Sequence, residues 1–77
     1  MAGRNEDRQS SKLLEQVGAR IVAARKRLGW TPYMLAKESG VTARMVRRVE
    51  AAQSACTLPL LARLARALKV TPQSLFP

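Results

Sequence analysis

Hydrophobic residues recur at helical spacing in the first half of the chain. Five of them follow one another at intervals of three and four: Leu14, Val17, Ile21, Ala24 and Leu28. Such spacing places side chains on one face of a helix. Ser10 or Ser11 can cap its start, and three consecutive basic residues before Gly29 are typical of a helix end. The pattern predicts a first helix that ends just before Gly29.

Two short amphipathic segments follow, separated by Gly40. Thr31 and Pro32 form a typical helix start, because threonine accepts from free N–H groups and proline needs no donor at the first helical position. Glycine adopts the left-handed conformation after a helix with little steric cost, and Thr42 can then cap a new helix. We expect one helix from about Pro32 to Ser39, burying Leu35 and Ala36, and another from about Ala43 to Ala51, burying Val46 and Val49.

The last third of the chain predicts a further helix and a turn. Thr57 opens a segment whose apolar stripe is Leu58, Leu61, Leu64, Ala65 and Leu68. Thr71 and Pro72 then begin a last turn that holds Leu75 and Phe76. No segment has the alternation of a strand, so the fold class is all-α.

Charge indicates the kind of partner. The net charge of +9 would attract a polyanion, and a domain that binds one gains affinity by releasing its counterions. The first ten residues balance two arginines against Glu6 and Asp7, without periodicity. We therefore expect a disordered polar tail over 1–10 and a single helix-turn-helix DNA-binding domain over 11–77, which holds the whole charge excess.

Several other classes of function lack the residues they need. Histidine is absent and Cys56 is the only cysteine, so one chain can build no zinc site, disulfide or Cys/His catalytic pair. No acid–base pair indicates an enzyme, and no cofactor is expected. Arginines interrupt the leucines of residues 58–68, and the N-terminus has no apolar signal region, so we expect a cytoplasmic protein without a membrane partner.

From Val17 to Phe76 the order of helices and turns resembles the Xre family, the Cro and C1 repressor type of regulator. The matching residues are Gly18, Ile21, Arg25, Gly29, Thr31, Leu35, Ala36, Gly40, Val41, Thr42, Val46, Glu50, Ala65, Leu68 and Leu75. The resemblance implies a compact five-helix bundle of the lambda-repressor type. It also implies that the third helix enters the major groove of duplex DNA, usually as a homodimer on a near-palindromic operator.

Two charges fall on apolar helix faces. Arg25 follows Ile21 by four residues on the first helix, and Glu50 follows Val46 by four on the third. Because an unpaired buried charge is very costly, we expect the two to neutralise each other, and the resembling family has an Arg–Glu pair at these positions. Glu50 is therefore interpreted as structural rather than catalytic.

Residues for DNA contact come from the third helix and its surroundings. By position, the resemblance assigns base contacts to Ala43, Arg44, Met45 and Arg48. Arginine pairs bidentately with guanine, and small apolar groups contact the thymine methyl. Phosphate contacts are expected from the start of the second helix and from nearby side chains, namely Thr31, Tyr33, Thr42, Arg47, Arg27 and Lys37.

The chain also departs from the family pattern. Pro32 stands where relatives commonly have a glutamine that links a phosphate to the recognition helix, and the loop 51–56 lacks basic residues. Tyr33 and Met34 place an aromatic and an apolar group where relatives usually have polar ones. The first two departures would weaken phosphate anchoring, whereas the last two suggest a protein contact.

Two functions from different classes fit these observations. The first is a sequence-specific transcriptional regulator, expected to be a repressor, that forms a homodimer through Leu60 and Phe76. The alternative is an antitoxin-type or other protein-binding module on the same fold, with a toxin-like partner. Its surface would consist of Tyr33, Met34, Leu60 and Phe76. A cationic membrane-surface helix is disfavoured, because the apolar residues build a core rather than one long face.

Overall fold

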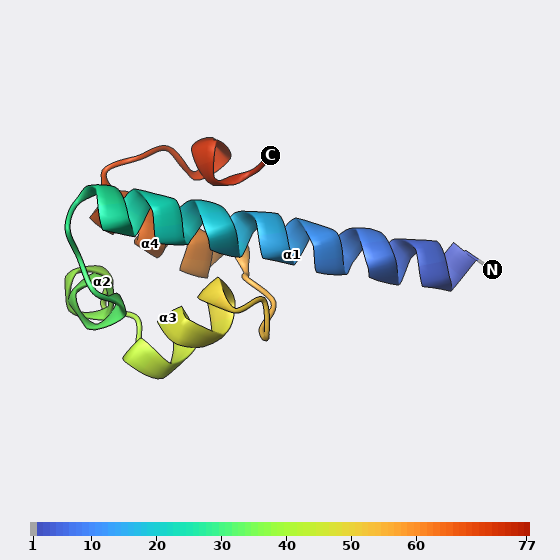
Figure 1. The fold of residues 1–77 in the computed structure, drawn as a ribbon, viewed down its shortest axis with the longest axis horizontal. Coiled ribbons are helices and arrows are strands. Elements are labelled where there is room, and N and C mark those ends of the chain that lie inside the picture. The colour runs from blue at the N-terminus through green and yellow to red at the C-terminus, as the bar shows by residue number, and fades with distance from the viewer. Residues whose placement is uncertain (1) are drawn as a thin grey trace.

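The computed structural model describes the backbone of residues 2–77 and the side chains of residues 11–77. Its elements are four α-helices and one 3-10 turn: α1 (Ala2–Arg27), α2 (Pro32–Ser39), α3 (Ala43–Glu50), α4 (Leu58–Leu68) and η1 (Pro72–Leu75) (Figure 1). The all-helical class is confirmed, but the expected fifth helix is a single 3-10 turn. Phe76 takes an extended conformation, with φ −95° and ψ 150°, which ends the turn.

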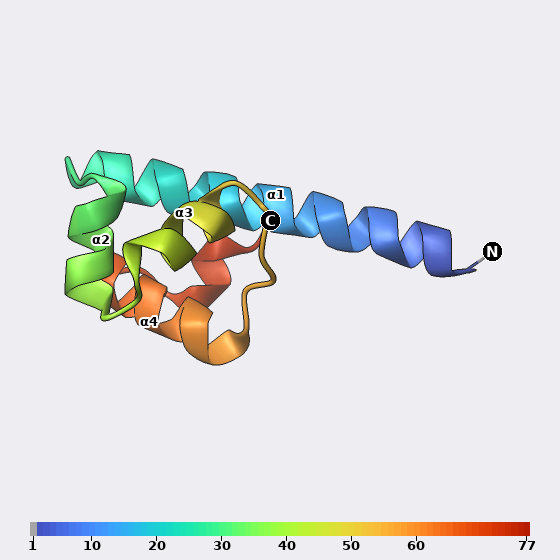
Figure 2. The same cartoon turned by 90° about the horizontal axis from the view of Figure 1, so that it is seen from below.

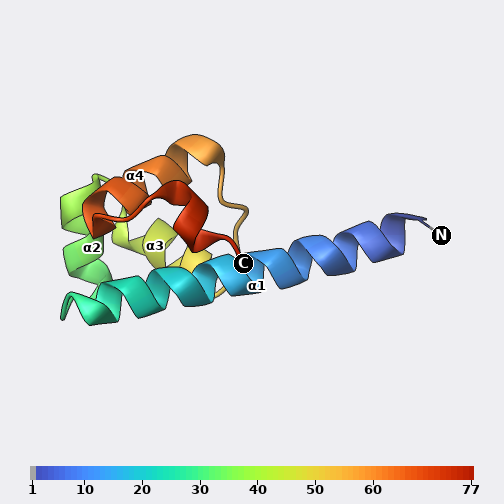
Figure 3. The same cartoon turned by 90° about the horizontal axis from the view of Figure 1, so that it is seen from above.

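The helices gather around the C-terminal half of α1. Figure 1 shows α3 on one side of α1 and the segment that contains η1 on the other, and Figure 2 shows α2 at one end of the body, where it packs against both α3 and α4. The N-terminal half of α1 projects beyond this body, as Figure 3 also shows, and the molecule measures 42 × 22 × 20 Å. None of the helices in the described part of the chain is long and apolar enough to cross a bilayer.

Helix α1 begins at Ala2, earlier than the predicted start at Ser10 or Ser11. Residues 4–11 contain neither glycine nor proline and include Arg, Glu and Gln, which favour helix, so nothing in this stretch stops the helix. The side chains of residues 1–10 lie outside the described residues. The disordered polar tail expected there stays a prediction.

Threonine caps begin every later element. The hydroxyls of Thr31, Thr42, Thr57 and Thr71 each accept a hydrogen bond from the backbone N–H three residues on, at 3.2 to 3.3 Å. Each cap satisfies a donor that a helix start leaves free, which confirms the predicted starts of α2, α3 and α4. Gly40 ends α2 in the left-handed conformation, with φ 73°, as expected.

One core joins all the elements. Its largest fully buried side chains are Ile21, Leu35, Val46, Leu61, Leu64 and Leu75. The prediction that Leu28 and Leu58 belong to the core is wrong. Leu28 is 40% exposed because α1 ends at Arg27 and the chain turns there, with the Leu28 N–H bonded to the Arg25 carbonyl. Leu58 is 74% exposed because it is the first residue of α4, and the half-buried Leu60 packs against the core instead.

Candidate nucleic-acid interface

A tight glycine turn fixes α3 against α2. The Gly40 N–H donates to the Ala36 carbonyl at 3.0 Å, and Val41, the next residue, is 8% exposed. Thr42 then caps α3. Because the turn residues are bonded to α2 or buried in the core, the direction of α3 follows from the position of α2.

Helix α3 has two chemically different faces. Val46 and Val49 are buried in the core. Arg44, Arg47 and Arg48 are exposed on the rest of its surface. The apolar face therefore holds the helix in place while three guanidinium groups point to solvent, where each can offer a fork of N–H donors.

The three arginines surround a shallow surface depression, the α3 hollow, of about 530 Å³. Its lining residues are Tyr33, Ala43, Arg44, Arg47, Arg48, Ala51 and Gln53. None of them is acidic, so no carboxylate in the lining neutralises the guanidinium charges. Such a surface attracts anions.

The structure brings half of the ten predicted contact residues to this hollow: Tyr33, Ala43, Arg44, Arg47 and Arg48. Thr31 and Thr42 are exposed at the starts of α2 and α3, where their hydroxyls cap the helices, but they do not line the hollow. Met45 is half-buried against the core rather than fully exposed. Lys37 is exposed on α2 but does not line the hollow. Arg27 lies beside Arg20 and Ser74, in a different depression formed with the segment that contains η1. That segment is on the opposite side of α1 from α3 (Figure 1).

Sequence reasoning missed Gln53. Ala52 takes a positive φ of 58°, and the Gln53 N–H donates to the Arg48 carbonyl at 2.8 Å, so the chain folds back beside α3. The available signal was a polar residue placed just after the arginine-rich helix. In the same loop, Cys56 packs against the core, and burial raises the pKa of its thiol above the ordinary value.

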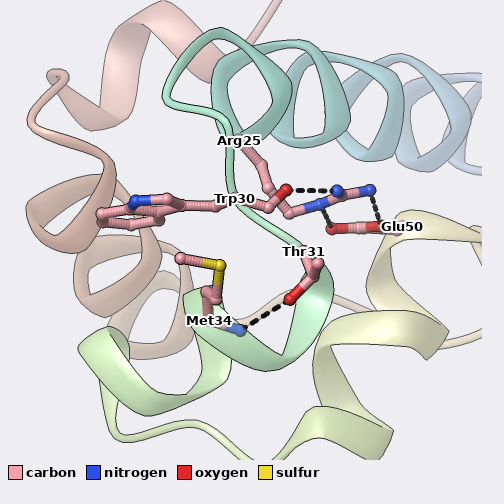
Figure 4. Close-up of polar contacts among 5 residues, drawn as sticks. All are labelled: Arg25, Trp30, Thr31, Met34 and Glu50. Atoms are coloured by element: carbon pink, nitrogen blue, oxygen red, sulfur yellow. Dashed lines mark hydrogen bonds and ion pairs between the residues drawn. The ribbon is translucent and has the colours of Figure 1, made fainter.

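An internal ion pair joins the end of α1 to the end of α3 (Figure 4). Arg25 Nε lies 2.7 Å from Glu50 Oε2, and Arg25 Nη2 lies 3.0 Å from Glu50 Oε1. Arg25 Nη1 also donates to the Trp30 carbonyl at 2.8 Å. Both charged side chains are only 10% exposed. This bidentate geometry ties the helix that carries the arginines to the longest helix of the fold.

Close backbone contact at Gly18 fixes the same two helices. A Cβ atom at this position would lie 2.7 Å from the Val49 carbonyl oxygen and 2.8 Å from that of Glu50. Real Cβ atoms do not approach oxygen so closely, so only glycine allows α1 to lie this near the end of α3.

Comparison with known proteins agrees with this geometry. The profile of the helix-turn-helix family HTH_3 matches residues 21–75. The restriction-modification controller protein C.AhdI from Aeromonas hydrophila is 33% identical with a TM-score of 0.80, over 82% of this chain and 96% of that one. The DNA-binding domain of BldD is 31% identical with a TM-score of 0.79, over 88% and 99%. The hypothetical transcription factor NHTF from Neisseria is 25% identical with a TM-score of 0.82, over 84% and 75%. No curated protein sequence matches the chain.

Proposed function

Because this chain belongs to the helix-turn-helix family HTH_3 of DNA-binding transcriptional regulators, we propose that it recognises a specific duplex sequence with α3 in the major groove. The observation that carries the proposal is the α3 hollow, in which Arg44, Arg47 and Arg48 are exposed without an acidic neighbour in the lining. A helix fits the width of the major groove, where each base pair presents a distinct set of donors and acceptors.

Within this proposal the side chains have separate roles. Arg44 and Arg48 contact guanines, and Ala43 and the accessible part of Met45 contact thymine methyl groups. Phosphate contacts come from the N-terminal turns of α2 and α3 and from the side chains of Thr31, Tyr33, Thr42, Arg47 and Lys37. Gln53 joins this set because it lines the α3 hollow. Arg27 is left out, because it lies in the depression beside Arg20.

We further propose that the protein represses transcription as a homodimer on a near-palindromic operator. A two-fold dimer places two recognition helices about one helical turn, roughly 34 Å, apart and doubles the number of base contacts. An operator that overlaps a promoter would exclude the polymerase, so repression needs no further surface. This chain is similar to a restriction-modification controller protein over nearly the whole length of that protein, which supports a regulatory role.

The test selects bound duplexes from random DNA and then compares two charge-removing variants. We expect a preferred site, on which Arg44→Ala costs about 1 to 3 kcal/mol of binding free energy and relaxes the choice at one base pair. Lys37→Ala is the matched control, since it removes an exposed charge of α2 outside the α3 hollow, and it should weaken all sequences alike.

Two results would count against base recognition by α3. One is a failure of selection to enrich any site. The other is an equal loss by Arg44→Ala on the preferred site and on random duplex, which would make Arg44 a phosphate contact only.

An antitoxin-type role remains a second candidate because two large apolar or aromatic side chains of α2 are solvent-exposed. Tyr33 is 61% exposed and Met34 is 44% exposed. A toxin-like protein that covers them would protect both from solvent. If Tyr33→Ser with Met34→Gln leaves binding to the selected site unchanged, these residues are free for such a partner. A loss of affinity would assign them to DNA.

A further inference from the structure

A second surface depression, the α4 groove, lies between the C-terminal end of α2 and helix α4. It has a volume of about 670 Å³ and shares no lining residue with the α3 hollow. Trp30, Ala62 and Ala67 supply its apolar part. Three cations, Arg63, Arg66 and Lys69, line it from α4 and the C-terminal cap of that helix.

The spacing of these cations places them together. Arg63, Arg66 and Lys69 are three residues apart, so they follow one face of α4, and all three are exposed. Basic residues in a last helical turn commonly offset the partial negative charge of the helix end. That explanation covers Arg66 and Lys69, but Arg63 lies in the middle of α4, where the effect of the helix end has faded.

Lys69 stands in a conformation that disfavours it. Its φ of 61° and ψ of 38° are left-handed, and this cap position usually holds glycine. A side chain there costs on the order of 1 to 2 kcal/mol. The turn that ends α4 is closed by the Lys69 N–H, which donates to the Arg66 carbonyl, and by the Val70 N–H, which donates to the Ala65 carbonyl, and it leaves Lys69 in the lining of the groove.

We propose that the α4 groove binds an acidic segment of a partner protein that also presents an apolar side chain. Carboxylates of the segment pair with the Arg63 and Arg66 guanidinium groups, whose planar donor forks match a carboxylate. The apolar side chain packs on Trp30, Ala62 and Ala67. Because this groove and the α3 hollow have different linings, the protein can hold the segment while α3 is on DNA.

A second copy of this chain does not fit as the occupant. Of the five acidic residues, Glu50 is paired with Arg25 and Glu38 lines the groove itself. Glu15 is a single exposed acid of α1, three residues from Lys12, and offers one carboxylate where the groove presents two arginines and a lysine. The only adjacent acids, Glu6 and Asp7, stand between Arg4 and Arg8 in a segment without a large apolar residue. A nucleic-acid backbone fits less well than a peptide, because phosphates and sugars offer no apolar side chain to pack on Trp30, Ala62 and Ala67.

The position of Trp30 supplies a direct measurement, because it is the only tryptophan in the chain. A short tryptophan-free peptide of glutamate and leucine, titrated into the full chain, should change the Trp30 emission saturably. The same peptide with glutamine in place of glutamate should bind at least about ten-fold more weakly, since it lacks the charges that pair with arginine.

Two double variants remove the same net charge from different places. Arg63→Gln with Arg66→Gln should weaken peptide binding about ten-fold. The matched control, Arg20→Gln with Arg27→Gln, changes exposed arginines of α1 outside the groove and should lose less than about two-fold. Lys69→Gly should raise the melting temperature, because glycine adopts the left-handed conformation without strain. The same substitution should weaken peptide binding, because it removes a cation from the groove.

The proposal is overturned if the two double variants lose affinity equally, or if the glutamine peptide binds as well as the acidic one. The same titration on protein already saturated with duplex DNA tells whether the α4 groove binds a protein segment or a second nucleic acid. Unchanged peptide affinity supports a distinct protein site. Displacement of the peptide by further duplex would make the groove a second nucleic-acid surface and contradict the proposal.

Discussion

Arg25 makes more polar contacts than any other side chain described in this chain. Its guanidinium group bonds to both carboxylate oxygens of Glu50 and to the Trp30 carbonyl. The side chain is nearly out of contact with water. A buried ion pair adds little net stability relative to apolar residues, but loss of one partner leaves the other charged and desolvated.

Glu50→Gln should therefore lower the free energy of unfolding by roughly 3 to 5 kcal/mol, because it strands the Arg25 charge in the interior. Replacing both residues by Met and Leu should be much milder. Thermal or urea unfolding measures the effect, and Glu15→Gln, which changes an exposed acid of α1, is the control. An unchanged melting temperature for Glu50→Gln would contradict a stabilising role for the pair.

Single residues differ in how far sequence alone could place them. The inward positions of Arg25 and Glu50 follow from the apolar stripes on which they fall. Leu28 and Leu58 continue such stripes as well, yet both are exposed. Helical period says which residues share a face, but it does not say where the helix ends or which neighbours cover that end.

At the scale of elements, the close approach of α1 to α3 determines the position of α3 in the fold. Gly18 allows backbone contact, and the ion pair fastens the same two helices near their ends. The two contacts act together, because Gly18 faces the carbonyls of Val49 and Glu50. A change at Gly18 should thus affect the ion pair and the pose of α3.

Gly18→Ala should destabilise the fold even though alanine favours helix. The new Cβ would meet the Val49 carbonyl oxygen at 2.7 Å, and backbone cannot move aside as a flexible side chain can. The strain, typically about 1 to 3 kcal/mol, exceeds the gain of up to about 1 kcal/mol from helix propensity. We expect a lower melting temperature and weaker DNA binding. The control is Ala19→Gly, which makes the reverse exchange at an exposed neighbouring position and therefore measures the effect of helix propensity alone.

The boundaries of the short helices were predictable because each begins with a threonine cap and two of them are separated by Gly40. The N-terminal extension of α1 was not predictable, since it depends on weak local preferences, whereas Thr71 and Pro72 did predict the turn that contains η1. Of the candidate interface, the exposed arginines of α3 could be assigned from sequence. The place of Arg27 and Gln53 could not, because it depends on the packing of η1 and on the left-handed Ala52.

For the molecule as a whole, charge governs the expected binding. The net charge of +9 and the arginines of the α3 hollow make the complex with DNA depend on released counterions. The logarithm of the binding constant should fall linearly with the logarithm of salt concentration, with a slope near −0.9 for each phosphate contacted. Titration of the selected duplex over a salt series tests this. Affinity that does not change with salt would rule out a phosphate-anchored complex.

Oligomeric state is the other whole-molecule prediction. The sequence predicts a weak homodimer through the end of the fourth helix and the C-terminal turn, with Leu60 and Phe76 at its centre. Leu60 lies near the start of α4, so we propose that this end of the helix forms the contact. Leu58 joins them because it is 74% exposed, whereas Leu60 is half-buried in its own chain. Covering exposed apolar side chains stabilises such a contact.

Sedimentation at tens of micromolar should show a dimer that Leu58→Glu or Phe76→Glu dissociates without unfolding. Leu60→Glu should instead lower the melting temperature, because Leu60 contacts the core. Lys12→Glu, at an exposed residue of α1, is the control for added negative charge. A strict monomer, both free and on DNA, would exclude the dimer.

The division of α3 into a buried and an exposed face also bears on how such a protein can evolve. The residues that hold the helix, Val46, Val49 and Glu50, are not the arginines that line the hollow. Under the proposed function, substitutions at Arg44 or Arg48 are expected to change target preference with little cost in stability. A descendant can acquire a new operator by mutations on this face alone while keeping its fold.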